Sequence, residues 1–472
     1  MVHLRTIFAT LMLIVLVTAL AFYNTSAINQ IGTQLLTRLE KDETNREQSS
    51  IRTLLMKNVG ESVINKAGNH QRQRQNNLSR LNQNASRDIK DIQKRQQNGF
   101  AQLSQEAFHD KCPQRRNITL EDIEMKQLPD NLYKLAPEVF DQFPKTFLEG
   151  YSNPCWKQGG DQIRCLPKLF LAGVAKCGTT DLYLKVASHP LIIHAKEKEP
   201  SWWTRNRYDR KQGEHKPVGS FFGYLHEFDK LANKMKSHQD ADTEVQKLIT
   251  VDGSPSTFWD NVFWRKYVSP ECTKGPTYVI ADVIRAILPK TKIIAIFRNP
   301  TDRLYSDYMF TGGRARTPQT FHEHVLKSTA SFDSCLESGG NLRSCIYKNF
   351  NGQHGHVGHD HLVMLMKGLY SVHAREWLYA FPREQLMFIR FEDWYSKCKQ
   401  ILPEIYSFLE LDSLMSTQID KICAKKNPTR KKNSKGPMLN ATRTILNKFY
   451  QVSRQELAQI TGDMNFLWDE WT

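Results

Sequence analysis

The chain has 472 residues, of which 40% are hydrophobic, 10% aromatic and 24% charged. This composition is typical of a globular protein and excludes a collagen, a wholly disordered chain and a membrane protein with many spans. Lys and Arg number 65 against 49 Asp and Glu, a formal net charge of +16. That excess favours polyanionic partners, which include nucleic acid, anionic lipid, phosphorylated cofactors and acidic polysaccharide.

An uncharged apolar run of 17 residues, from residue 7 to residue 23, lies close to the N-terminus. Its length is at the short end of the roughly 17–25 residues that span a bilayer, and His3 and Arg5 precede it. This basic flank predicts that residues 1–6 face the cytoplasm and that the rest of the chain faces a secretory lumen. We interpret residues 7–23 as a transmembrane signal anchor. A cleaved signal peptide is the alternative, because residues 19–21 (Ala-Leu-Ala) resemble a cleavage site.

A lumenal location excludes nucleic acid as the partner and makes the nine cysteines disulfide candidates. We expect two short-range pairs, Cys155–Cys165 and Cys335–Cys345, because each closes a short loop, and the odd count leaves at least one cysteine unpaired. The same location suits the Asn-x-Ser/Thr triplets that begin at Asn24, Asn77, Asn84, Asn117 and Asn440.

Residues 24 to about 110 are rich in Gln, Asn and Arg and contain neither Trp nor Pro. Between Leu78 and Ala107 apolar residues recur at spacings of three and four, which predicts a helix with a heptad-like repeat. Two interpretations stay open: a short coiled coil that pairs two copies into a homodimer, or a solvated helical stalk. With the mixed linker that follows, we assign residues 24–152 to a lumenal stem.

Near Leu166 the composition changes. Continuously apolar runs at residues 168–173, 292–297 and 386–390 predict buried strands of a parallel sheet. Helical stretches such as 179–187 and 368–380 alternate with them. The alternation predicts an α/β fold, with a parallel sheet flanked by helices.

The first of these strands runs into a glycine turn and then a helix. Gly173 and Gly178 flank four residues, and two threonines follow, which is the outline of a phosphate-binding loop. Backbone N–H groups at the start of a helix bind phosphate through unsatisfied donors and the helix dipole. Thr179 holds the place of the usual lysine of nucleotide triphosphatases, and a lysine stands earlier, at Lys176, so a kinase or triphosphatase is disfavoured. A plain strand-to-helix turn is the alternative.

The segment KCGTT after this strand, followed by HPLIIHAKEKEPSWW, resembles the Golgi carbohydrate sulfotransferases. These enzymes use 3′-phosphoadenosine 5′-phosphosulfate (PAPS) as the sulfuryl donor and require no metal. The resemblance extends from about Asn153 to the C-terminus, which implies a sulfotransferase domain at residues 153–472 with a PAPS-dependent, P-loop-like parallel sheet. It also implies a single-pass type II protein of the Golgi membrane, with a lumenal catalytic domain, or a secreted form after cleavage of the stem.

Two further motifs support the resemblance. In AIFRNPTDRLYSDY the family positions for the 3′-phosphate are Arg298 and Ser306. Residues 424–448 contain eight Lys or Arg and no acid, and the family carries here a Lys-Gly loop that closes over the nucleotide. A solvated charge run is the alternative. Together the resemblance implies that the donor is held by Lys176, Cys177, Gly178, Thr179, Thr180, Arg298, Ser306, Lys435 and Gly436.

The resemblance also implies catalytic roles. Lys176 is expected to stabilise the leaving group, and Glu199 to act as the general base for the attacking hydroxyl. Glu197 is a weaker candidate for the base, and an ion pair of Glu199 with Lys196 or Lys198 is the alternative. We expect Cys177 to be a free, buried thiol, because a disulfide would restrain a loop that must wrap the ligand.

KEPSWWTR, FPREQL and GPMLNATR resemble the branch that sulfates the 6-hydroxyl of 4-sulfated N-acetylgalactosamine in chondroitin or dermatan sulfate. Sulfation of heparan sulfate or galactose, or glycan binding without catalysis, are alternatives. The chain departs from heparan-type relatives at Gly253, where a lysine is common. The histidines of residues 354–361 have the composition of a zinc or copper site, but the family chemistry needs no metal, and contact with an acidic glycan is at least as good an interpretation.

Overall fold

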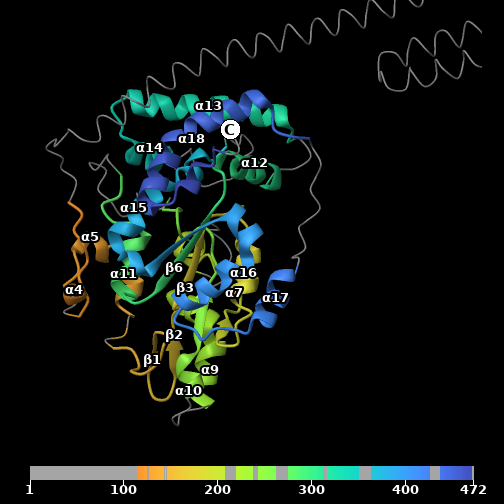
Figure 1. Cartoon of the computed structure of the whole chain (residues 1–472). Helices are drawn as coiled ribbons and strands as arrows, with labels where there is room; N and C mark the ends of the chain where they lie inside the picture. Colours follow the sequence, from red (N-terminus) through yellow and green to blue (C-terminus); the bar gives the residue numbers. More distant parts are fainter. Residues whose placement is uncertain are drawn as a thin grey trace, which may run out of the picture. The chain divides into compact units, whose positions relative to one another are not determined.

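The computed structural model describes residues 114–124, 127–142, 144, 146–207, 219–237, 243–261, 275–311, 316–349, 363–425 and 436–469 (Figure 1). The expected anchor, most of the stem, the histidines of residues 354–361 and Lys435 lie outside these ranges. Across the ranges that are described, no helix has the length and apolar character needed to cross a bilayer.

The core of the fold is a five-stranded sheet in which every neighbouring pair of strands is parallel. The strand order is β4-β5-β3-β6-β7, with β3 in the centre. The strands are β3 (Leu169–Gly173), β4 (Ile192–His194), β5 (Ile249–Asp252), β6 (Lys292–Phe297) and β7 (Leu386–Arg390). The three predicted strands are therefore confirmed as β3, β6 and β7, and their apolar character follows from burial on both faces of the sheet.

Helices cover both faces of this sheet. In Figure 1, α7 (Thr179–Val186), α16 (Phe391–Phe408) and α17 (Ser416–Ala424) lie on one side of β3 and β6, while α11 (Ile280–Ile287) and α15 (Tyr370–Ala380) lie on the other. The predicted helices 179–187 and 368–380 are confirmed as α7 and α15. A short 3₁₀ turn precedes α15, which begins two residues later than expected. The expected α/β architecture is confirmed.

A second helical layer has its own apolar core. It consists of α12 (Pro300–Thr311), α13 (Pro318–Glu337), α14 (Leu342–Asn349) and α18 (Asn440–Thr461), seen together at the top of Figure 1. Phe321, Val325, Leu446 and Tyr450 are buried between these helices. The smaller elements are α4 (Leu120–Glu124), α5 (Asp130–Tyr133), α6 (Pro137–Phe140), β1 (Cys155–Lys157), β2 (Ile163–Cys165), η2 (Trp202–Asn206), α8 (Phe221–Leu225), η3 (His226–Phe228), α9 (Asp229–Ser237), α10 (Thr243–Lys247), η6 (Arg383–Gln385) and η7 (Met464–Leu467).

Disulfides fix three of the outer contacts. The expected pairs are confirmed: Cys155–Cys165 joins the antiparallel strands β1 and β2, and Cys335–Cys345 joins α13 to α14. A third pair, Cys398–Cys423, joins α16 to α17 and was not predicted, because its partners are 25 residues apart. Cys177 is free and buried, as expected.

A buried cluster of charges ties the N-terminal segment of the domain to the helices. The guanidinium of Arg115 pairs with Asp282 of α11 at 2.9 Å and with Glu376 of α15, and Arg343 donates to the same glutamate at 2.6 Å. Burial raises the pKa of Asp282 to about 6 even though Arg115 opposes the rise. Both carboxylates are almost fully buried, so their charges are tolerated only because the two arginines stand beside them.

Replacing Arg115 with methionine is expected to lower the free energy of unfolding by about 3–5 kcal/mol, because two buried carboxylates lose a cation. The neighbouring Arg116→Met, which removes an exposed pair with Asp122 and exposed hydrogen bonds to backbone carbonyls such as that of Gln127, is the matched control and should cost about 1 kcal/mol or less. Urea unfolding of both variants is the measurement.

The loss in Arg115→Met should also depend on pH. A carboxyl whose pKa in the folded state lies above its unfolded value takes up a proton on folding, so its contribution to stability improves as the pH falls. Without Arg115 the pKa of Asp282 rises further, and the deficit should shrink as the pH is lowered from 8 through 6. An equal deficit at both pH values would contradict this account.

Candidate functional site

The carboxyl ends of the five strands define the candidate site. Because all five strands are parallel, they end at one edge of the sheet, and the segments that follow them meet there. The loop of residues 174–178 follows β3, Arg298 follows β6, Phe391 follows β7 and Gly253 follows β5. The sequence motifs therefore converge at this edge, although they are far apart in the chain.

The loop after β3 has the form of an anion-binding turn. The N–H of Val174 donates to the carbonyl of Ile296 at 3.0 Å, and that of Cys177 donates to Val174 at 3.2 Å. Lys176 and Gly178 both have positive φ, of 72° and 81°, and α7 begins directly after Gly178. The first N–H groups of an α-helix have no acceptor within the helix, so this turn presents donors and the positive end of the helix dipole.

Phe391 links the loop to Arg298. A Cβ atom at Gly178 would lie 2.7 Å from the ring of Phe391, so the glycine is required by this close approach as well as by its φ. The guanidinium of Arg298 lies 5.3 Å from the centre of the same ring. It makes no hydrogen bond or ion pair with any described residue. Arg298 is thus held beside the loop by an aromatic contact that leaves its five donors available.

Helix α12 brings Lys176 and Ser306 together. The ammonium group of Lys176 lies 3.4 Å from the centre of the Phe310 ring. Phe310 comes four residues after Ser306, so both side chains lie on the same face of α12. The neighbouring Tyr305 donates to the carbonyl of Gly436 at 2.8 Å. Three of the predicted motifs therefore meet on this helix, while Lys435 lies outside the described residues.

Cys177 has a structural position in this arrangement. Its thiol is completely buried and lies 3.8 Å from the hydroxyl of Tyr370, which donates to the carbonyl of Arg298 at 2.9 Å. Burial raises the pKa of the thiol to about 11, so it is protonated at neutral pH and is a poor nucleophile. Cys177 and Tyr370 together connect the loop to the end of β6.

Glu199 reaches the loop through a lysine. Lys198 donates to the hydroxyl of Thr180 at 3.2 Å and pairs with Glu199, whose side chain is 42% exposed. The ion pair with Lys198, which was the alternative interpretation of Glu199, is therefore present, and it places the carboxylate near the start of α7. Glu197 is also exposed, and its backbone N–H donates to a carboxylate oxygen of Glu227 at 2.9 Å.

The backbone around Gly253 leaves no room for a side chain. Its N–H donates to the carbonyl of Lys198 at 3.1 Å, and a Cβ atom there would lie 2.8 Å from that carbonyl oxygen and 2.6 Å from the ring of Tyr183. A lysine at this position would not fit. The ammonium group of Lys198 instead supplies a cation beside α7.

Sequence reasoning missed the aromatic residues of the site. Phe391 and Phe310 hold Arg298 and Lys176, and both had a usable signal: Phe391 directly follows a predicted strand, and Phe310 lies one helical turn from Ser306. The neighbouring Trp202 and Trp203, by contrast, are buried in the core. Over the described ranges, no group of His, Cys, Asp and Glu side chains is arranged to hold a metal ion.

Comparison with known proteins gives several similarities. Residues 166–458 match the family described as the sulfotransferase domain. Carbohydrate sulfotransferase 15 of Mus musculus is 33% identical over 343 residues, which are 70% of this chain and 59% of the mouse protein. The protein of the same name in Homo sapiens is 32% identical over 401 residues, which are 73% of this chain and 70% of the human protein. The structure of a sulfotransferase from Alicyclobacillus acidocaldarius is 18% identical, with a TM-score of 0.38. The match covers 63% of this chain and 96% of the bacterial chain.

Replacing Gly178 with alanine is expected to destabilise the domain more than the same change at Gly339. Both glycines have φ near 80°, but no atom lies within 4 Å of a Cβ at Gly339. The two variants share the strain of a positive φ, about 1–2 kcal/mol, and Gly178→Ala adds roughly 1–3 kcal/mol of overpacking against Phe391. Urea unfolding measures the difference, and adding Phe391→Leu should recover part of it. Equal losses in the two single variants would refute the contact.

Proposed function

Because this chain belongs to the sulfotransferase domain family and, within it, to the carbohydrate sulfotransferases, we propose that it transfers a sulfuryl group from PAPS to a sugar hydroxyl of a glycosaminoglycan. The chief support is the meeting of the loop after β3 with Arg298 and Ser306 at the carboxyl edge of the sheet. Phe391 touches the loop and Arg298, and α12 carries both Ser306 and the ring that holds Lys176.

The residues present fit a bisphosphorylated donor. We assign the 5′-phosphosulfate to the turn of residues 176–180, where helix N–H groups and Lys176 offer positive charge. We assign the 3′-phosphate to Arg298 and Ser306, whose side chains make no hydrogen bond with a described residue. A planar guanidinium binds phosphate through two parallel hydrogen bonds, so Arg298 is the stronger of these two contacts.

Transfer moves one group between two oxygens. A bond forms between the sugar hydroxyl oxygen and sulfur, and the bond between sulfur and the 5′-phosphate oxygen breaks, which releases adenosine 3′,5′-bisphosphate. Negative charge grows on the released oxygen, and Lys176 stabilises it. We assign to Glu199 the role of accepting the hydroxyl proton, because its carboxylate is half-exposed and lies close to the start of α7.

The acceptor that we propose is the 6-hydroxyl of 4-sulfated N-acetylgalactosamine in chondroitin or dermatan sulfate. It is supported by the resemblance of KEPSWWTR and GPMLNATR to that branch and by the net charge of +16, which suits an acceptor that is already sulfated. The same proposal places the enzyme in the Golgi membrane, with residues 7–23 as its single span and the catalytic domain in the lumen.

Donor binding should depend on Arg298. Arg298→Ala removes a charge-assisted contact worth about 1.5–3 kcal/mol, so the affinity for adenosine 3′,5′-bisphosphate should fall roughly 10- to 150-fold. Arg383→Ala is the matched control, because Arg383 lies before β7, at the opposite edge of the sheet. Calorimetry on the folded variants is the measurement, and unchanged affinity in Arg298→Ala would remove Arg298 from the donor site.

Measurements of kcat and of donor affinity should distinguish the proposed roles of Lys176 and Glu199. Lys176→Met is expected to lower both kcat and the affinity for the donor. The same ammonium group is proposed to contact the phosphosulfate and to stabilise the charge on the leaving adenosine 3′,5′-bisphosphate. Glu199→Gln should lower kcat by ~10²–10⁴ with donor affinity nearly intact. Glu197→Gln is the control, and if it shows the loss instead, the base is Glu197.

The acceptor is tested by incubating the enzyme with labelled PAPS and chondroitin 4-sulfate, desulfated chondroitin or heparan sulfate in parallel. Preferred labelling of chondroitin 4-sulfate, with a 4,6-disulfated disaccharide as product, is the expected result. Labelling confined to heparan sulfate would contradict the proposed acceptor but support sulfuryl transfer. No labelling of any glycan would contradict both parts of the proposal.

A further inference from the structure

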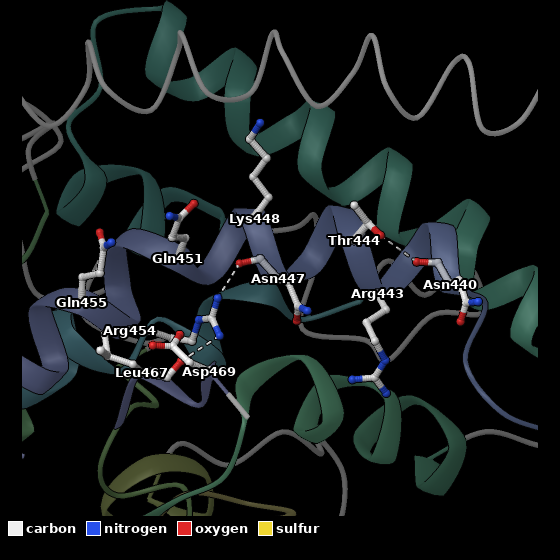
Figure 2. A pocket seen from close by; sticks show the side chains of 10 residues that line it. All are labelled: Asn440, Arg443, Thr444, Asn447, Lys448, Gln451, Arg454, Gln455, Leu467 and Asp469. Atoms are coloured by element: carbon white, nitrogen blue, oxygen red, sulfur yellow. Dashed lines mark hydrogen bonds between the residues drawn. The ribbon is translucent and has the colours of Figure 1, made fainter. Parts of the chain in front are cut away.

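Helix α18 carries a pocket that the sequence motifs did not indicate. It has a volume of about 610 Å³, within the roughly 300–1,000 Å³ of ligand sites in proteins. It follows one side of the helix from Asn440 to Gln455, about 22 Å at a rise of roughly 1.5 Å per residue. We call this pocket the α18 trough. Figure 2 shows the residues that line it, with the side chain of Lys448 projecting above the helix and those of Arg443 and Arg454 lying below it.

The chemistry of the α18 trough is that of a site for a hydroxyl-rich anion. Four of its side chains are amides and three are cations, against one acid and one apolar residue, Leu467. The side-chain amides of Gln451 and Gln455 make no hydrogen bond with any described residue. Amides of this kind both donate to and accept from sugar hydroxyls, while the cations suit sulfate or carboxylate. No aromatic side chain is among the described residues that line it, so nothing there offers a surface on which a nucleic-acid base would stack.

Two of its cations carry unmet bonding capacity. Lys448 is only 8% exposed, yet its ammonium group has no hydrogen-bond partner among the residues that the structure describes. Arg454 donates to the carbonyls of Leu467 and Asn447 at 2.9 and 3.1 Å, and its Nε has no partner within the described ranges. A buried cation without a partner is costly, and a bound anion would remove that cost.

The first turn of α12 connects the α18 trough to the carboxyl edge of the sheet, where we assign the PAPS site. Arg443 pairs with Asp302 at 2.7 Å, and the side-chain oxygen of Asn447 accepts from Thr301 at 2.8 Å. Both partners stand within four residues of Arg298 in the sequence. The α18 trough therefore adjoins α12, the helix that also carries Ser306.

We propose that the α18 trough binds a stretch of the sulfated glycan acceptor away from the sugar that receives the sulfuryl group. This rests on the proposed function and adds a second contact region to it, which would make the enzyme favour long acceptors over short ones. Each trough contact made by a long chain adds to the binding energy of the whole, while a short oligosaccharide reaches only the reacting site.

The test adds negative charge to the α18 trough without altering its shape. Gln451→Glu/Gln455→Glu changes two exposed positions, and Gln162→Glu/Gln400→Glu makes the same change of net charge at exposed positions outside the trough. Binding of chondroitin 4-sulfate polymer and of its tetrasaccharide to the full chain is measured by calorimetry at low and physiological salt, independently of turnover.

We expect the trough variant to lose roughly tenfold in affinity for the polymer at low salt and less at high salt, with tetrasaccharide and adenosine 3′,5′-bisphosphate binding unchanged. The control should keep near-normal affinity for all three. Lys448→Met should lower the affinity for the polymer in the same way. Equal losses for polymer and tetrasaccharide, no loss at all, or the same loss with a single-stranded oligonucleotide would overturn the proposal. A failure of the proposed function would be seen separately. The unmodified protein would then transfer no sulfuryl group to any glycan, whereas the α18 trough is tested by binding alone.

Discussion

The candidate site depends above all on the direction of the strands. Five parallel strands end at one edge, so the segments that follow them meet there however far apart they lie in the chain. Helix α7 begins at this edge, and its first N–H groups lack acceptors within the helix. The start of α12, by contrast, is capped by the side-chain oxygen of Asn299. The edge therefore attracts anions through the backbone of α7, and Arg298 adds to that field.

Close packing at this edge decides where the cations stand. Phe391 presses against Gly178, and the carbonyl of Lys198 fills the space beside Gly253, so neither position accepts a side chain. Positive charge comes instead from residues that reach in from loops, with Lys198 directed to α7 and Lys176 to α12. Lys198 pairs with Glu199, whereas the rings of Phe310 and Phe391 hold Lys176 and Arg298 and carry no negative charge. A carboxylate in the place of Phe391 would pair with Arg298 and leave less positive charge for a ligand.

The sequence sufficed for features that are local and failed for those that are not. Continuous apolar runs identified β3, β6 and β7, and the short spacing of Cys155 and Cys165 identified their disulfide. The partner of Cys398 and the contact of Phe391 with Gly178 depend on which helix packs on which face of the sheet, and no local pattern carries that information. The α18 trough was hidden for a similar reason: its amides look like ordinary solvated positions until the helix is seen beside α12.

Helix α12 holds these parts in register. Arg303 and Lys367 both pair with Asp307 inside the protein, at 3.2 and 3.0 Å, and although burial opposes the charge of Asp307, the two cations hold its pKa below the usual range. Such buried pairs add little stability, since desolvation offsets most of the attraction. Arg303 and Asp307 both belong to α12, so the pair of Asp307 with Lys367, which lies outside α12, is the one that fixes the rotation of the helix about its axis. That rotation presents Phe310 to Lys176, with Ser306 one turn earlier on the same face, while the first turn of the same helix contacts α18. If α12 could rotate, its contacts with Lys176 and with α18 would not form together. The buried charges of α12 therefore affect the site through the orientation of the helix rather than through stability.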